Sequence, residues 1–181
     1  MTIEEKKGKL MGIGSKMERI GQNLQAKLLK AKPIVILASS VRDIVSRITG
    51  LNPAAIYCAD QKYYLIDFDT WKKIILYDLV DQKKYLSDRF DCDNFSDYFA
   101  ARAAFVYGLN SCGKASGEIK FKTTKKHCGY HRWNVILTIT DNKEYELWMY
   151  EAMNDEIDLL KVGYKAKGHS WEYYPTRMEF N

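Results

Sequence analysis

The chain begins with a helical pattern of apolar positions. Six of them follow one another at steps of three or four residues and share one helix face: Leu10, Ile13, Met17, Ile20, Leu24 and Leu28. Pro33 ends this helix, because the residue before a proline avoids the helical conformation. Residues 34–49 predict a second helix closed by Gly50, and residues 92–107 predict another closed by Gly108.

The middle of the chain predicts shorter elements. Asp69 and Thr70 are suited to cap a helix that contains Trp71. Residues 111–117 predict a loop, and residues 118–124 predict a strand.

Apolar and polar residues alternate along two later segments, which predicts two strands. The first runs from His131 to Thr140 and the second from Tyr145 to Glu151, with turn residues between them. Both apolar faces must lie on the same side of the sheet, so the numbers of cross-strand partners sum to an even number. With a three-residue loop at 141–143 this sum is 284, and residue 151 then lies opposite Trp133. Helices followed by an antiparallel sheet favour an α+β domain.

Composition and charge divide the chain into two parts. It has 181 residues, 46% of them hydrophobic and 28% charged, as in an ordinary soluble globular protein. Residues 1–32 hold eight basic and three acidic side chains and so account for the whole net charge of +5. We expect a basic amphipathic helix over 1–32 and a single domain over 33–181.

This charge distribution leaves several partners open. The basic helix suits nucleic acid, an acidic partner or an anionic membrane, or it is a solvated amphipathic helix. The sequence shows neither a secretory signal nor an apolar run near the roughly 18 residues of a membrane span. We therefore expect a cytoplasmic protein without a transmembrane segment, whose four cysteines are reduced thiols.

Cys92 is the first candidate for chemistry, because it stands at the start of a predicted helix. Free amide N–H groups and the positive end of the helix dipole stabilise a thiolate there, and the same groups can hold an oxyanion. Nearby acids act against the thiolate, since their charges raise the pKa of a thiol. Asp91 and Asp93, together with the later Asp155 and Glu156, are candidate oxygen ligands for Ca²⁺.

His131 and Glu151 are the candidate partners of that thiol. His131 lies on the apolar face of its strand, two positions before Trp133. The hairpin register places Glu151 on the same face, diagonal to His131, and places Glu146 on the opposite face. The sequence therefore predicts a nucleophile, a base and an orienting acid, in the chain order of papain and transglutaminases.

Three segments then resemble a known family: YLSDRFDCDNFSDYFAARAAFVYG, GYHRWNV and LWMYEAMNDEI. They are similar to the papain-like C-terminal domain of the fairy-ring mushroom agglutinin and to related small phage and prophage proteins. The resemblance covers about residues 60–158. It implies a papain-like cysteine-hydrolase fold, with the nucleophile helix packed on an antiparallel sheet.

The resemblance also implies roles for single residues. Cys92, His131 and Glu151 become a catalytic triad of a calcium-dependent cysteine protease acting on a protein or peptide substrate. Further residues are candidates for the oxyanion hole or the support of the base: Gln82, Tyr85, Trp133 and Asn134. A phage-encoded protein of this kind acts in the host cytoplasm.

Other interpretations remain open from the sequence. Four residues have the chemistry of a zinc site: Cys112, His127, Cys128 and His131. The domain is alternatively a catalytically silent binding module that interacts with a host factor, or an amide transferase of the transglutaminase kind. The oligomeric state is not set by any motif.

Overall fold

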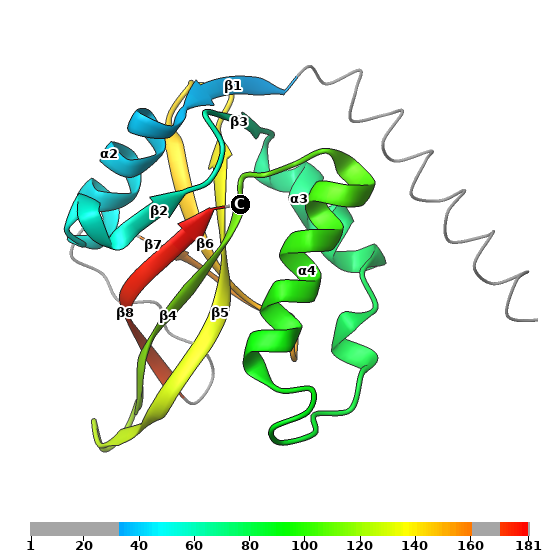
Figure 1. The fold of residues 1–181 in the computed structure, drawn as a ribbon, viewed down its shortest axis with the longest axis vertical. Coiled ribbons are helices and arrows are strands. Elements are labelled where there is room, and N and C mark those ends of the chain that lie inside the picture. Colours follow the sequence, from blue (N-terminus) through cyan, green and yellow to red (C-terminus); the bar gives the residue numbers. More distant parts are fainter. Residues whose placement is uncertain (1–32, 161–170, 181) are drawn as a thin grey trace, which may run out of the picture.

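The computed structural model describes residues 33–160 and 171–180 (Figure 1). Its helices are α2 (Ala38–Thr49), α3 (Phe68–Tyr77) and α4 (Cys92–Tyr107), with 3-10 turns η1 (Pro53–Ala55) and η2 (Val80–Gln82). Its strands are β1 (Ile34–Leu37), β2 (Ile56–Cys58), β3 (Lys62–Leu65), β4 (Cys112–Phe121), β5 (His127–Ile139), β6 (Tyr145–Glu151), β7 (Glu156–Leu160) and β8 (Trp171–Phe180). The helix expected over 1–32 lies outside the described residues.

A six-stranded sheet forms the centre of the domain, in the order β2-β8-β4-β5-β6-β7. The neighbours β8, β4, β5, β6 and β7 pair antiparallel, whereas β2 pairs parallel with β8. Strands β1 and β3 form a separate antiparallel pair. The last strand of the chain therefore lies inside the sheet, between an early strand and β4 (Figure 1).

Helices cover both faces of this sheet, and each face has its own apolar core. Side chains of α2, such as Val41, pack with Val135 and Leu137 of β5. Side chains of α3 and α4 pack on the other face with Ile136 and Tyr150. Successive residues of a strand point to opposite faces, so one strand contributes to both cores.

Helix α4 begins and ends where its sequence predicts. The Asp91 backbone N–H donates to Asn94 Oδ1 at 3.2 Å, which satisfies a polar group at the helix start. Gly108 closes the helix in the left-handed region at φ 67°, and its N–H donates to the Ala104 carbonyl at 3.0 Å. Cys92 is consequently the first residue of the helix.

The β5–β6 hairpin also has the predicted register. Leu137 pairs with Leu147, and Asn134 pairs with Tyr150. The turn closes when the Lys143 N–H donates to the Thr140 carbonyl at 2.9 Å. This register brings the end of β6 beside the start of β5.

Three local predictions are wrong. Residues 34–37 are strand rather than helix, because their β-branched, apolar run pairs with β3 and the helix starts only at Ala38. Residues 112–117 belong to β4 rather than to a loop, because β5 and β8 pair with them on both sides. The cap of α3 is Asp67, whose Oδ1 accepts from the Thr70 N–H at 2.7 Å.

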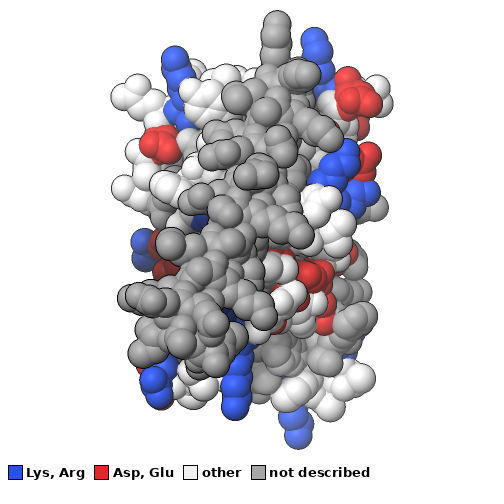
Figure 2. Space-filling model, turned by 90° about the vertical axis from the view of Figure 1, so that its right-hand side faces the viewer, with Lys and Arg blue, Asp and Glu red and all other residues white. Residues whose placement is uncertain are grey.

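Within residues 33–160 and 171–180 no helix is long and apolar enough to cross a membrane. Figure 2 shows the side of the molecule that lies on the right in Figure 1. On the described part of this face, basic and acidic side chains occur close to one another.

Candidate functional site

Cys92 is half-buried at the amino-terminal end of α4, where the helix meets β5. The backbone N–H of Arg132, in β5, hydrogen-bonds the Cys92 sulfur. The thiol also lies within hydrogen-bonding reach of the His131 ring. The sulfur therefore faces a backbone donor and an imidazole at the positive end of a helix.

His131 joins this thiol to Glu151. Its Nε2 lies 2.5 Å from Glu151 Oε2, and both side chains are buried. With Nε2 engaged by the carboxylate, Nδ1 is the ring nitrogen left for the sulfur. The structure thus brings together the three residues that the sequence singled out, and we call them the thiol cluster (Cys92, His131 and Glu151).

Electrostatics within the thiol cluster favour an ion pair. Burial opposes ionisation of Cys92, but the His131 hydrogen bond, the Arg132 N–H and the His131 charge outweigh burial and lower the thiol pKa. Burial likewise disfavours charge on His131, yet its contacts with Cys92 and Glu151 prevail and raise its pKa to about 9. Between these two pKa values, the thiolate and the imidazolium coexist.

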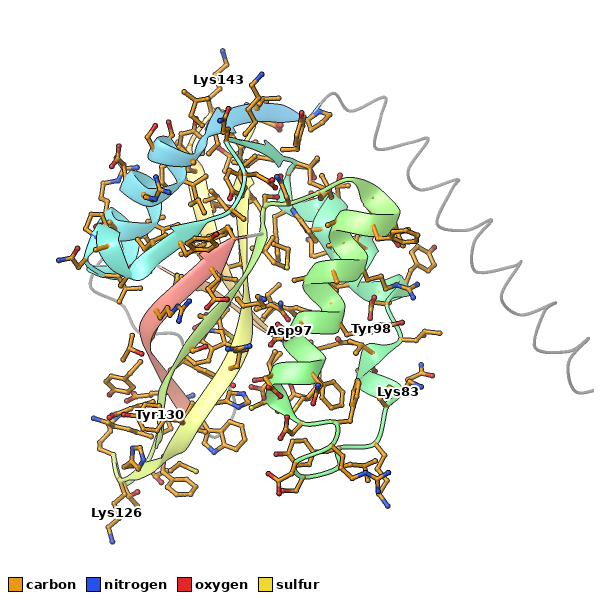
Figure 3. All side chains as sticks on the ribbon, viewed as in Figure 1. Lys83, Asp97, Tyr98, Lys126, Tyr130 and Lys143 are labelled. Atoms are coloured by element: carbon orange, nitrogen blue, oxygen red, sulfur yellow. The ribbon has the colours of Figure 1, made fainter. Side chains whose placement is uncertain are left out.

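Ion pairs tie α4 to the sheet beside the cluster. Asp97 points from α4 toward the strands, whereas Tyr98 lies on the far side of the helix (Figure 3). The Asp97 carboxylate lies 3.0 Å from Lys114 Nζ and 3.6 Å from an Arg132 guanidinium nitrogen. These contacts hold the helix start and the Arg132 backbone in register with each other.

Aromatic rings enclose the imidazole. The His131 ring stacks on Trp133 with centroids 6.1 Å apart, and Trp171 meets its edge at 5.8 Å. The ring centroid of Tyr173 lies 6.1 Å from that of His131. The same tyrosine ring packs edge-on against Trp133, with centroids 5.0 Å apart. The alternation along β5 predicts Trp133 beside the base, whereas no pattern near His131 predicts Trp171 and Tyr173, because they come from β8, far along the chain.

The other predicted supporting residues have different positions. Asn134 is buried toward α4, where its Nδ2 donates to the Ser96 carbonyl at 2.9 Å and to the Gly113 carbonyl at 3.3 Å. It therefore links the helix to the strand. Tyr85 is exposed. Partial loss of solvent around its hydroxyl raises the pKa of Tyr85, and the charge of the nearby Cys92 adds to this effect. Among the described residues, the Gln82 side chain makes no hydrogen bond to the cluster.

The described residues offer no metal centre. Asp91 and Asp93 hydrogen-bond each other, which raises the pKa of Asp93. Nowhere in the described ranges do three His, Cys, Asp or Glu side chains form a group able to hold an ion. The calcium expectation is therefore wrong for this part of the chain, and the alternative zinc set, which includes the buried Cys112 and the exposed Cys128, is not assembled either.

Comparisons with known proteins give structural neighbours only. No family model matches the chain, and no curated protein matches it in sequence. A structure of PSL1a, a lectin of Polyporus squamosus, in complex with E64 aligns with 81% of this chain and 51% of that one, at 17% identity and a TM-score of 0.56. Polyporus squamosus lectin bound to the epitope Neu5Acα2-6Galβ1-4GlcNAc aligns with 81% of this chain and 49% of that one, at 15% identity and a TM-score of 0.55.

These neighbours correct the expected fold class. The papain-like cysteine-hydrolase fold is wrong, because 42% of the described residues are strand, 32% are helix, and the similar structures are lectins rather than proteases or phage proteins. The order of a cysteine helix, a histidine strand and an acidic strand is local, and it does not determine how β2 and β8 complete the sheet. The chain spans about half the length of these lectins and shares the fold of the matching part.

Proposed function

We propose that this domain catalyses acyl transfer with Cys92 as the nucleophile. The observation that carries the proposal is the position of His131, which contacts the Cys92 thiol and, through Nε2 at 2.5 Å, the buried carboxylate of Glu151. Nucleophilic catalysis by a thiol requires a base within hydrogen-bond reach that is itself oriented by a third group. The thiol cluster meets that requirement.

The proposed reaction has two halves. The Cys92 thiolate attacks the carbonyl carbon of an amide or ester and forms a C–S bond, while protonated His131 gives its proton to the departing amine or alcohol. Water then attacks the thioester, His131 accepts a proton from it, and cleavage of the C–S bond releases the acid and restores the thiolate. An amine in place of water gives an amide instead. Glu151 keeps the imidazole oriented throughout.

The helix start supplies the electrostatic part of the proposal. Attack on the carbonyl creates a negative oxygen next to the sulfur. Backbone N–H groups in the first turn of a helix have no partner within the helix. In α4 the Asn94 N–H donates to Asp93 Oδ1 at 2.9 Å, which leaves the N–H groups of Cys92 and Asp93 for this oxygen. Neither Gln82 nor another side chain is needed for that role.

Selective labelling of Cys92 tests the proposal. E64, the ligand in one neighbouring structure, is an epoxide that alkylates thiolates and is therefore a suitable probe, together with iodoacetamide. At pH 7 we expect one equivalent of label, located at Cys92 by peptide mass spectrometry, and none in Cys92→Ser.

Cys128 provides the matched control, because it is an exposed thiol outside the cluster. Cys128→Ser should be labelled like the wild type. If Cys128 reacts as fast as Cys92, or if His131→Gln leaves the Cys92 rate unchanged, the proposal fails.

Carbohydrate binding is a second candidate, favoured by the lectin neighbours. Tyr130 gives it a concrete location, since this residue is 75% exposed near the end of the β4–β5 hairpin (Figure 3). Exposed aromatic faces suit the apolar faces of sugar rings. Calorimetric titration with Neu5Acα2-6Galβ1-4GlcNAc tests it: binding that Tyr130→Ala abolishes and Cys92→Ala preserves supports a module separate from the thiol chemistry.

A further inference from the structure

We infer that Tyr173 is a positioning residue of the thiol cluster, holding the Glu151 carboxylate in place for His131; this inference rests on the proposed function of Cys92. Tyr173 belongs to β8 and its side chain is fully buried. Its hydroxyl lies 3.5 Å from Glu151 Oε2 and donates to that oxygen.

Tyr173 and His131 act on the same oxygen atom. Oε2 of Glu151 receives both the Tyr173 hydroxyl and, at 2.5 Å, His131 Nε2. A buried carboxylate depends on its donors, because burial costs free energy unless hydrogen bonds replace water. Two donors from different strands therefore fix the carboxylate in one rotamer.

The rings around Tyr173 leave it little freedom. It packs edge-on against Trp133 with centroids 5.0 Å apart and 64° between the planes. Trp133 in turn stacks on His131. The tyrosine, the tryptophan and the imidazole therefore form one packed unit, in which movement of the hydroxyl would disturb the rings.

The sheet brings Tyr173 to this point through a close strand contact. Tyr173 pairs with Ile119 of β4, and a register shift between Ser116 and Gly117 follows. Gly117, which pairs with His131 on its other side, lies so close to β8 that an added Cβ would be 2.1 Å from the Tyr174 carbonyl oxygen. Strand β8, which carries Tyr173, is thus in close backbone contact with β4, the strand that pairs with His131.

Tyr173→Phe tests the inference, because it removes one oxygen atom and keeps the ring. We expect alkylation of Cys92 at pH 7 to slow roughly 10-fold, in line with loss of one hydrogen bond to a charged group, and the acid limb of its pH profile to move up by about one unit. A purely structural role would leave this profile in place.

Tyr63→Phe is the matched control. Tyr63 is also a fully buried tyrosine, but its hydroxyl donates to the Phe180 carbonyl at 3.0 Å, away from the cluster. This variant should lower the melting temperature without moving the Cys92 profile. An equal effect of the two substitutions on the profile overturns the inference.

Imidazole NMR separates this inference from the proposed function. The chain has three histidines, so His131 is assigned by comparison with His131→Gln. In Tyr173→Phe we expect the His131 titration midpoint to fall, because the carboxylate is no longer held against Nε2. If the His131 midpoint in Tyr173→Phe is unchanged or raised, the role of Tyr173 is refuted, whether or not Cys92 is reactive. If Cys92 of the wild type is unreactive, only the proposed function is refuted.

Discussion

Nε2 of His131 and Oε2 of Glu151 lie 2.5 Å apart, with 8% and 1% of the two residues exposed. A contact this short between an imidazole and a carboxylate is charge-assisted. Its burial makes each partner dependent on the other, because an isolated buried charge is costly. Together with the hydrogen bond to Cys92, this pair raises the pKa of His131, and the His131 hydrogen bond and charge in turn lower the pKa of Cys92.

Glu151→Gln should disable this pair while preserving its shape. Without the carboxylate charge, the pKa of His131 should fall from about 9 toward its ordinary value and the pKa of Cys92 should rise. Alkylation of Cys92 at pH 7 should slow roughly 10- to 100-fold. The control is Glu146→Gln, whose carboxylate accepts from Trp148 Nε1 at 3.2 Å and lies away from the base. Equal rates in the two variants would contradict a role for Glu151.

The hairpin and the nucleophile helix were predictable because their signals are local. Alternation in β5 and β6 fixes their register, which places Glu151 beside His131. Helix α4 spans Cys92–Tyr107. Its start follows from the polar residue before it, and its end follows from Gly108 after it. The roles of Cys92, His131 and Glu151 in catalysis stay a prediction.

The rest of the site depends on contacts between distant segments. Tyr173 and Trp171 reach His131 only because β8 inserts between β2 and β4, and no local pattern specifies that pairing. The glycines of β4 lie in the segment predicted as a loop, because the pairing of β4 with its neighbouring strands is likewise not specified by any local pattern. Gly117 is required by the approach of β8, which is invisible in the sequence around it.

The stability of the fold should depend on pH through His131. Its folded pKa of about 9 lies above the ordinary value of 6.5, so its contribution is fully present below pH 6.5 and is lost as pH rises toward 9. The difference in free energy of unfolding between the wild type and Glu151→Gln should therefore shrink over this window. Urea denaturation at pH 6, 7.5 and 9 measures it. A constant difference would show that the pair does not titrate there.

The buried Asp78 and the half-buried Arg102 form a second ion pair, on the α4 side of the sheet. Arg102 Nε lies 3.0 Å from Asp78 Oδ2, and Asp78 Oδ1 accepts from the Val80 N–H at 2.9 Å. Arg102→Met should destabilise the domain by about 3 kcal/mol at pH 7, because it leaves a buried carboxylate without its counter-charge.

That cost should diminish in acid. Burial already raises the pKa of Asp78, and an acid with a raised folded pKa costs stability while it is ionised and ceases to do so when it is protonated. Urea denaturation of Arg102→Met should show a smaller deficit at pH 4.5 than at pH 7. Arg47→Met, on the exposed side of α2, is the control and should change stability by about 0.5 kcal/mol or less at either pH. A deficit independent of pH would mean that Arg102 stabilises through packing alone.

Gly117→Ala should damage stability and reactivity together. The added Cβ meets the Tyr174 carbonyl oxygen at 2.1 Å and the Pro175 Cα at 2.8 Å, both of which are backbone atoms that cannot rotate away. Strand β8 must then move, at a cost of about 3 kcal/mol, and Tyr173 moves with it. We expect a lower urea midpoint and slower alkylation of Cys92.

Gly50→Ala separates this effect from general destabilisation. Gly50 has φ 75°, but an added Cβ there meets nothing within 4 Å. Its substitution should cost about 1 kcal/mol through backbone strain alone and leave the Cys92 rate unchanged. If both alanine variants slow alkylation in proportion to their loss of stability, the rate reports unfolding; if only Gly117→Ala slows it, the spacing of β4 and β8 sets the geometry of the thiol cluster.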